Sequence, residues 1–226
     1  MAVSESDDWH RRRSAAVIVA HPDDETLWAG GTVLMHPACC WRIVTLCRAG
    51  DADRAPKFRR VCGLLDAAGA MGELDDGAAQ EPLEPEAVRR AVVDLLGGAA
   101  YDLVLTHGPH GEYTRHRRHE EASRAVVELW EAGELRAAEL WMFAYEDGRG
   151  AHLPRAAAGA HRRCALPEPV WQQKRSIITD VYGFGSDGFE ARTTPREEAF
   201  WCFRSAREVR QWLDTGGSSD EGPGAL

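Results

Sequence analysis

The sequence lacks the features that mark several classes of protein. No apolar run approaches the ~20 residues that a helix needs to span a bilayer. The first residues carry acidic and basic side chains without the apolar stretch of a secretion signal. Positive charge is also in deficit, with 27 Lys and Arg against 36 Asp and Glu and a formal net charge of −9, which disfavours nucleic acids and anionic membranes as partners. We therefore expect a soluble, cytoplasmic protein.

Two chemical signatures are missing as well. The six cysteines form no Cys-x-x-Cys pair and have no regular spacing, so we expect small apolar core residues in a reducing compartment. No Gly-x-Gly-x-x-Gly loop occurs, and two acidic residues at the start of the first expected helix would repel a phosphate. These observations argue against a nucleotide-binding module, which the strand–loop–helix openings alone would suggest.

Apolar runs alternate with helical periodicity along the chain. Strands are expected at 15–20, 41–47, 101–106 and 139–144, and helices at about 25–36, 56–69, 84–97 and 117–132. This alternation predicts βαβ crossovers, and hence an α/β fold with a mostly parallel sheet and helices on both faces.

The length fits a single domain, expected over 15–214. Polar or Gly/Ser-rich tails over 1–14 and 215–226 are expected to be disordered. A long loop is expected over 147–166 and a last helix over about 195–213.

A polar cluster follows the first expected strand. The apolar run 15–19 leads directly into Ala-His-Pro-Asp-Asp-Glu at 20–25. The carboxyl end of a strand is where ligands bind in an α/β sheet. There His21 and Asp24 offer metal-ligand chemistry, and Asp23 offers a general base. Alternatively, Asp23 and Asp24 only cap the helix that follows.

A second polar cluster follows the expected strand at 101–106. Four of the nine histidines fall here, at 107, 110, 116 and 119. His116 and His119 are three residues apart at a helix start, so they can face the same direction. If both clusters meet at one edge of the sheet, His21, Asp24 and His119 form a three-ligand set with one position left for water, as in catalytic zinc sites. The histidines at 107 and 110 lie next to glycines and could instead only brace the loop.

With both clusters, the chain resembles the PIG-L/LmbE-like zinc deacetylases, which remove N-acyl groups from amino-sugar conjugates. The resemblance covers roughly 15–145. It rests on 20–27, Gly30-Gly31, Thr45 through Gly50-Asp51, Asp76-Gly77, 106–113 and the pair His116…His119. It implies a Rossmann-like fold and zinc held by His21, Asp24 and His119. It also implies Asp23 as general base and His116 as a second catalytic group.

The chain departs from the family at one position. The family usually has His-Pro-Asp-His where this sequence has His116-Arg117-Arg118-His119. Arg118 cannot accept a hydrogen bond, and its charge would disfavour a protonated His116. Either Glu120 or Glu121 replaces the carboxylate, or His116 acts as a neutral group, or the enzyme is weakened. We expect Arg118 to face away from the site or to contact an acidic group of the substrate.

The resemblance also implies an activity. The expected enzyme hydrolyses an N-acetyl or other N-acyl group from a small amino-sugar conjugate of the N-acetylglucosamine type. The expected cofactor is Zn²⁺, and Fe²⁺ suits the same ligands. Candidate substrate-binding residues are Asp51, Arg54, His110 and Arg118. The alternatives are an amidase for larger acyl groups and a metal-binding member with weakened catalysis. The sequence is compatible with a homo-oligomer but does not fix the oligomeric state.

Overall fold

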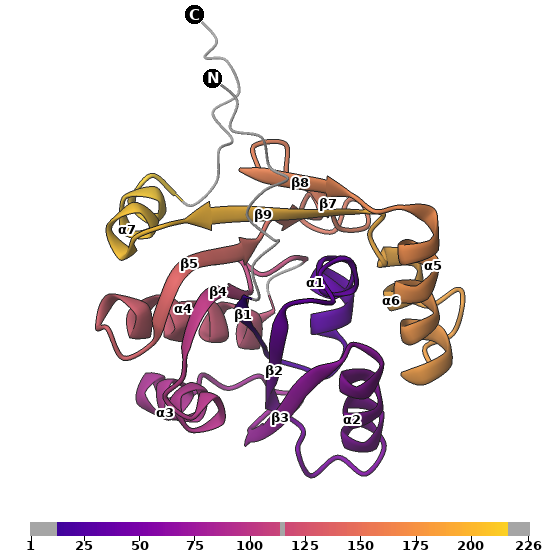
Figure 1. Cartoon of the computed structure of the whole chain (residues 1–226), viewed down its shortest axis with the longest axis horizontal. Coiled ribbons are helices and arrows are strands. Elements are labelled where there is room, and N and C mark those ends of the chain that lie inside the picture. Colours follow the sequence, from indigo (N-terminus) through magenta and orange to yellow (C-terminus); the bar gives the residue numbers. More distant parts are fainter. Residues whose placement is uncertain (1–12, 114–115, 217–226) are drawn as a thin grey trace, which may run out of the picture.

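A seven-stranded sheet forms the centre of the computed structural model, which describes residues 13–113 and 116–216 (Figure 1). The strand order is β3-β2-β1-β4-β5-β9-β8. The strands are β1 (Ser14–Val19), β2 (Cys40–Cys47), β3 (Ala67–Leu74), β4 (Ala100–Thr106), β5 (Arg136–Phe143), β8 (Arg162–Ala165) and β9 (Glu197–Phe203). The first five pair in parallel, whereas β9 is antiparallel to both β5 and β8. The predicted α/β fold with a mostly parallel sheet is confirmed.

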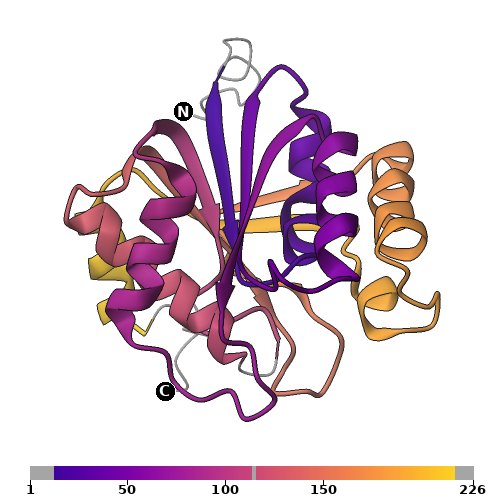
Figure 2. The same ribbon diagram turned by 90° about the horizontal axis from the view of Figure 1, so that it is seen from below.

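Helices cover both faces of the sheet (Figure 2). One face carries α1 (Asp24–Met35), α2 (Arg54–Leu64), α5 (Glu168–Ser176), the π-helix η1 (Ile177–Val181) and α6 (Phe189–Thr193). The other face carries α3 (Pro85–Leu96), α4 (Arg117–Glu131) and α7 (Ala206–Asp214). A separate two-stranded pair joins β6 (Tyr145–Glu146) to β7 (Arg155–Ala156). None of the described helices is long and apolar enough to cross a membrane.

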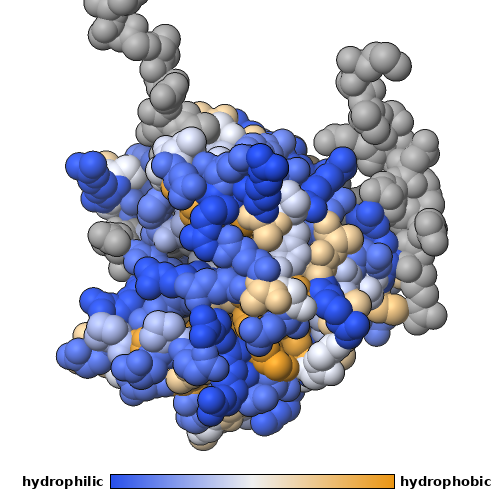
Figure 3. All heavy atoms as spheres, turned by 90° about the vertical axis from the view of Figure 1, so that its left-hand side faces the viewer, coloured by the Kyte–Doolittle hydropathy of each residue, from blue (hydrophilic) through white to orange (hydrophobic). Residues whose placement is uncertain are grey.

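Burial on two faces explains why the central strands are continuously apolar. In β1 the side chains of Ala15, Val17 and Val19 enter the core under α1, whereas Ala16 and Ile18 enter the core under α4. All five residues are fully buried. A strand in a parallel sheet covered by helices on both faces has no solvent-facing side. The outer surface beyond α3, α4 and α7 is by contrast mostly hydrophilic (Figure 3).

Two expected helices differ from the structure. The helix expected over 195–213 is instead β9 followed by α7, because Ala199, Trp201 and Phe203 point into one core and Phe200 into the other. That alternation of aromatic side chains is typical of a buried strand. The helix expected over 56–69 ends at Leu64, and the following residues form β3.

Further elements lie in segments that showed no clear pattern. The loop expected over 147–166 contains the short strands β7 and β8, and no expected element anticipated α5 and η1. Most residues of the expected tails lie outside the described part of the chain. At the edge of the first tail, Ser14 already belongs to β1.

Candidate metal centre and active site

The candidate site lies where the strand order reverses. From β1 the chain continues to β2 on one side, and from β4 it continues to β5 on the other. Such a switch point opens a crevice at the carboxyl ends of the strands. Here the loops after the first four parallel strands line a pocket of about 350 Å³, together with Phe189 and Glu190 of α6. A larger hollow of about 700 Å³ between α3 and α4 contains none of the ligand candidates described below.

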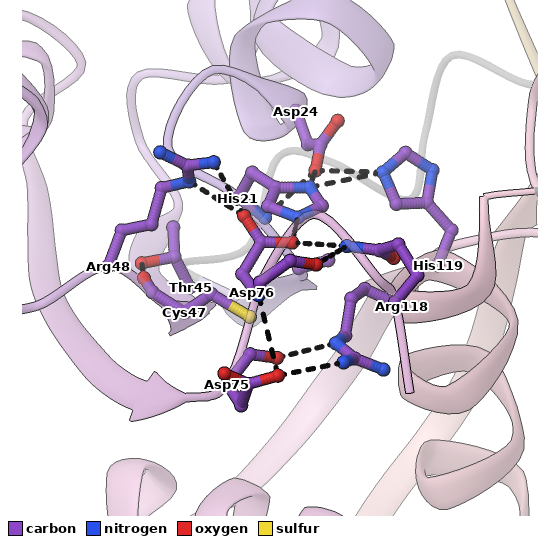
Figure 4. A network of polar contacts seen from close by, with 12 residues as sticks. His21, Asp24, Thr45, Cys47, Arg48, Asp75, Asp76, Arg118 and His119 are labelled. Atoms are coloured by element: carbon purple, nitrogen blue, oxygen red, sulfur yellow. Dashed lines mark hydrogen bonds and ion pairs between the residues drawn. The ribbon is translucent and has the colours of Figure 1, made fainter. Parts of the chain in front are cut away.

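Three ligand atoms from the two predicted clusters meet in this pocket (Figure 4). His21 Nδ1 is 3.1 Å from Asp24 Oδ2, and His119 Nε2 is 3.3 Å from each of these two atoms. Ligand atoms around a tetrahedral zinc ion, with bonds of about 2.0–2.1 Å, lie about 3.3 Å apart. The spacing and the donor types of His21, Asp24 and His119 therefore fit a zinc ion or a similar divalent metal.

Carboxylates orient both candidate ligand histidines. The second ring nitrogen of His21, Nε2, lies 3.1 Å from Asp76 Oδ1. The second ring nitrogen of His119, Nδ1, lies 2.7 Å from Glu112 Oε2. A carboxylate on the outer nitrogen fixes the ring and leaves the inner nitrogen free for a metal. This arrangement supports the metal assignment independently of the ligand spacing.

Asp24, the third candidate ligand, is held by hydrogen bonds from two N–H groups. Trp28 donates its indole N–H to Asp24 Oδ1 at 3.3 Å, which leaves Oδ2 toward the histidines. Oδ2 also accepts the backbone N–H of His21 at 2.9 Å. The alternative that Asp23 and Asp24 only cap the helix is not supported. Asp23 occupies the N-cap position of α1, but its side chain makes no capping hydrogen bond.

His107 is a further possible ligand, but both of its ring nitrogens are engaged in hydrogen bonds. His107 lies near Asp24 and His119, and all three are buried. However, His107 Nε2 accepts the backbone N–H of Ala20 at 2.9 Å, and its Nδ1 lies 2.9 Å from Glu112 Oε2. With both ring nitrogens engaged, His107 braces the two loops against each other.

The charges of the site favour a cation. Burial alone would lower the pKa of His119, but the carboxylates of Asp24 and Glu112 outweigh it and raise that pKa to about 10. A metal and a proton compete for the same ring nitrogen, so a field that retains a proton there also favours a bound metal ion.

His116 is placed beside the proposed metal position without a carboxylate partner. Its ring stacks on His119 at 4.4 Å and lies 4.8 Å from the ring of His21. Its Nδ1 is buried and has no hydrogen-bond partner among the described residues. Burial and the neighbouring His119 and His21 lower the pKa of His116 to about 4. This lowered pKa favours the neutral form of His116 near pH 7.

Asp23 lies at the pocket wall in a strained backbone conformation. Its φ is 124° and its ψ is −31°, a region that non-glycine residues rarely adopt. Its Oδ2 forms an ion pair of 2.9 Å with Arg54. Burial and the charge of Asp24 raise the pKa of Asp23, and Arg54 partly offsets this.

The four candidate substrate-binding residues are placed differently from one another. Arg54 lines the pocket. Asp51 does not line it, and accepts the backbone N–H groups of residues 53 and 54 at the start of α2. His110 is exposed outside the pocket, 3.3 Å from the carbonyl oxygen of Gly216. A contact of Asp51 or His110 with a substrate in this pocket is therefore not supported.

Arg118 faces away from the pocket, the first of its two expected orientations. Its guanidinium donates to the backbone carbonyls of Asp75 at 2.6 Å and Glu81 at 2.9 Å, and pairs with Glu121 at 2.6 Å. Its side chain is 2% exposed. The substrate-binding assignment of Arg118 is therefore corrected: it holds the loop between β3 and α3. Glu121 is used in the same contact and does not replace the carboxylate missing beside His116.

Several residues of the site were missed from the sequence. Glu112 and Asp76 belong to the family motifs, but their hydrogen bonds to histidines become visible only when the loops meet. Tyr113 and Phe189 form an aromatic wall of the pocket, with ring centroids 4.9 Å apart. Phe189 lies in no motif, so no sequence signal identifies it.

Comparison with known proteins identifies a family and related folds. The family model of PIG-L, GlcNAc-PI de-N-acetylase, matches residues 16–130. No curated protein sequence matches the chain. Among solved structures, N,N'-diacetylchitobiose deacetylase from Pyrococcus horikoshii is similar with a TM-score of 0.65 and 14% identity, over 85% of this chain and 84% of that one.

Two further structures share the fold. A deacetylase of the teicoplanin biosynthesis pathway aligns with a TM-score of 0.62 and 13% identity, over 85% of this chain and 98% of that one. GalB, the 4-carboxy-2-hydroxymuconate hydratase from Pseudomonas putida KT2440, aligns with a TM-score of 0.58 and 15% identity, over 93% of this chain and 92% of that one. These low identities establish the fold alone, whereas the family model covers about half of the sequence and both polar clusters. The chain belongs to the PIG-L (GlcNAc-PI de-N-acetylase) family.

Proposed function

We propose that the protein is a metal-dependent hydrolase that removes an N-acetyl or another N-acyl group from a small amino-sugar conjugate. One observation carries this proposal: the side chains of His21, Asp24 and His119 converge in the pocket that also holds Asp23. A three-ligand site with a free position, next to a carboxylate, is typical of metal hydrolases. The family membership supports the same chemistry.

The three ligands would hold Zn²⁺, or Fe²⁺, which suits the same imidazole and carboxylate donors. When bound, such an ion supplies Lewis acidity and lowers the pKa of water toward neutrality. The protein's own residues prepare this site, because Asp76 and Glu112 fix the two histidine rings before an ion arrives.

Asp23 is the proposed general base. It takes a proton from the attacking water and returns this proton to the amine that leaves. An amine is a poor leaving group unless it is protonated, so one carboxylate serves both steps. The ion pair with Arg54 restricts the side chain of Asp23 and holds it at the pocket wall.

His116 is proposed to act in its neutral form. A neutral imidazole carries one N–H, which can donate a hydrogen bond to the oxyanion of the tetrahedral intermediate. Because the family's usual carboxylate is missing, this donor is less firmly oriented than the rings of His21 and His119. The weakened-enzyme alternative rests on this difference.

The pocket walls support an amino-sugar substrate. Arg48, Asp76 and Gln80 present polar groups on one part of the wall, and Tyr113 and Phe189 form an aromatic part. Phe189 is 37% exposed, which is high for a large apolar residue in this protein. A sugar ring has both a hydroxyl-rich edge and an apolar face, so it can contact both parts.

The decisive experiment is an assay of primary amine released from a panel of N-acetylated amino-sugar conjugates. Protein loaded with Zn²⁺ or Fe²⁺ is compared with an Asp23→Asn variant loaded in the same way. Turnover by the wild type, lost in the variant, supports the deacetylase. Equal rates would contradict the role of Asp23. Turnover only on conjugates with longer acyl chains would favour the amidase alternative, and a metal-loaded but inactive wild type would favour the weakened member.

A further inference from the structure

The backbone of Asp23 needs support from its surroundings. A non-glycine residue with φ 124° is strained, and such conformations persist only where neighbouring contacts hold them. The position of the carboxylate depends on this conformation. The contacts that hold Asp23 can be followed on two sides, along its backbone and along its side chain.

The backbone contact runs through a buried carboxylate. The N–H of Asp23 donates to Glu25 Oε2 at 3.0 Å. Glu25 is fully buried, and its Oε1 accepts hydroxyl hydrogen bonds of 2.7 Å from Thr26 and from Tyr182. Burial raises the pKa of Tyr182, so its phenol remains a hydrogen-bond donor. The hydroxyl of Tyr182 therefore fixes the carboxylate that holds the Asp23 amide.

The side-chain contact runs through an arginine. Asp23 Oδ2 pairs with Arg54 Nη1 at 2.9 Å. The guanidinium of Arg54 lies over the ring of Phe184, 4.4 Å from its centroid. A cation over an aromatic face is attracted by the ring and restricted in position. Phe184 therefore limits where the Arg54 guanidinium can place the carboxylate of Asp23.

Both contacts end on the same short segment. Tyr182 follows η1 directly, and its N–H donates to the carbonyl of Ile177, the first residue of that π-helix. Gly183, with φ 81°, turns the chain so that Phe184 donates its N–H to the carbonyl of Ile178. Short π-helices are rare and occur frequently at functional sites.

We propose that the segment from Ile177 to Phe184 is a positioning element for Asp23, and this inference rests on the proposed role of Asp23 as general base. Neither Tyr182 nor Phe184 lines the pocket, so both are positioning residues rather than catalytic ones. The segment lies beyond residues 16–130, which the family model matches. The part of the chain without recognisable motifs thus fixes the base that the motif supplies.

The test is the variant Tyr182→Phe, which keeps the ring and removes only the hydroxyl. We expect kcat on the N-acetylated substrate to fall about tenfold, because Glu25 loses one of its donors, while KM and metal content stay unchanged. The matched control is Tyr145→Phe. Tyr145 is also buried, and its hydroxyl contacts the backbone of residues 197 and 199 instead of Glu25.

A second readout does not depend on turnover. Hydrogen exchange of the Asp23 amide, followed by NMR, is expected to be about tenfold faster in Tyr182→Phe and unchanged in Tyr145→Phe. Equal exchange and equal kcat in both variants would overturn the inference. An inactive wild type would contradict the proposed function, while the exchange measurement would still decide the positioning contact. If Tyr182→Phe does not fold, Phe184→Leu tests the second contact, with an expected loss of about threefold in kcat at constant KM.

Discussion

The part of the chain matched by the family model and the part that follows it contribute different residues to the candidate site. Residues 16–130 supply every proposed metal ligand, the carboxylates that orient them, and Asp23. Residues after 130 supply β9 and β8, the helix α5 that packs against α1, and the helix α7 that packs against α4. They add the exposed aromatic wall at Phe189 and the supporting contacts of Tyr182 and Phe184. The comparison teaches that the reactive groups and their direct partners lie in the matched part, whereas a further layer of support comes from elements with no motif.

Removing a ligand from the matched part should have the largest effect. In His119→Ala one of three ligands is lost, so we expect metal affinity to fall at least about 100-fold and amine release to become undetectable. Metal content and competition with a chelator measure the first effect, and the amine assay measures the second. Retention of a tightly bound ion in His119→Ala would show that the metal is held elsewhere.

Removing a buried charge from the later part should instead reduce stability. Lys174 of α5 and Glu198 of β9 form a fully buried pair of 2.7 Å, and Glu198 also accepts the N–H groups of Gly31 and Thr32 in α1. A Cβ at Gly31 would lie 2.4 Å from Leu166 Cδ2 and 2.9 Å from Glu198 Oε1, so a larger residue there would displace these side chains. Breaking such a pair by Lys174→Met should cost about 3 kcal/mol of unfolding free energy.

The control for this substitution is Lys57→Met, which breaks a surface pair with Asp53 of the same length, 2.7 Å. That change should cost less than about 1 kcal/mol in urea unfolding. The folded Lys174→Met protein should keep the kcat of the wild type. Equal stability losses in the two variants would contradict the structural role assigned to the later part.

An intermediate effect is expected for the carboxylate that orients His21. Asp76→Asn keeps the shape but removes the charge facing His21 Nε2, so metal affinity should fall about tenfold. The control is Asp75→Asn at the adjacent, 67% exposed carboxylate, which contacts Arg118 and not a ligand. Competition with a chelator measures both affinities. The account would be contradicted if the Asp75 variant lost as much affinity as the Asp76 variant.

The smallest effect concerns the backbone strain at Asp23. At most positions, Gly is less stable than Ala. Because φ is 124° here, we expect Asp23→Gly to be about 1 kcal/mol more stable than Asp23→Ala in urea unfolding. Both variants lose the carboxylate and the ion pair with Arg54, so the difference between them isolates the strain. A variant order with Ala above Gly would show that the conformation carries no cost.

How much of the molecule is predictable from its sequence also differs between the two parts. The strands and helices up to residue 131 follow clear apolar periods, and only the end of α2 and the glycine-containing strand β3 depart from them. In β3, a side chain at Gly72 would approach the carbonyl oxygen of Leu46 to 2.7 Å, so close packing against β2 selects a residue with no strand preference. The aromatic run of β9 does not indicate a strand by itself, because both of its faces are buried only through pairing with the neighbours β5 and β8.

In the candidate site, too, contacts between residues far apart in the chain could not be predicted from the sequence. The sequence is sufficient to propose the three ligands, because His21 and Asp24 are close in the chain and His119 lies at the start of a helix. The partners of Arg118 could not be predicted, since Asp75 and Glu81 lie about forty residues away in the chain. The hydrogen bond from Tyr182 to Glu25 joins residues 157 positions apart. It also depends on a π-helix that no local sequence pattern predicts.

The most direct test of the central claim is a crystal structure of the zinc-loaded protein with anomalous scattering measured at the zinc edge. The account predicts one strong peak within bonding distance of His21 Nδ1, Asp24 Oδ2 and His119 Nε2, with the carboxylate of Asp23 facing the free coordination position. A peak bonded to His107, or no peak at these three atoms in protein that contains zinc, would contradict it.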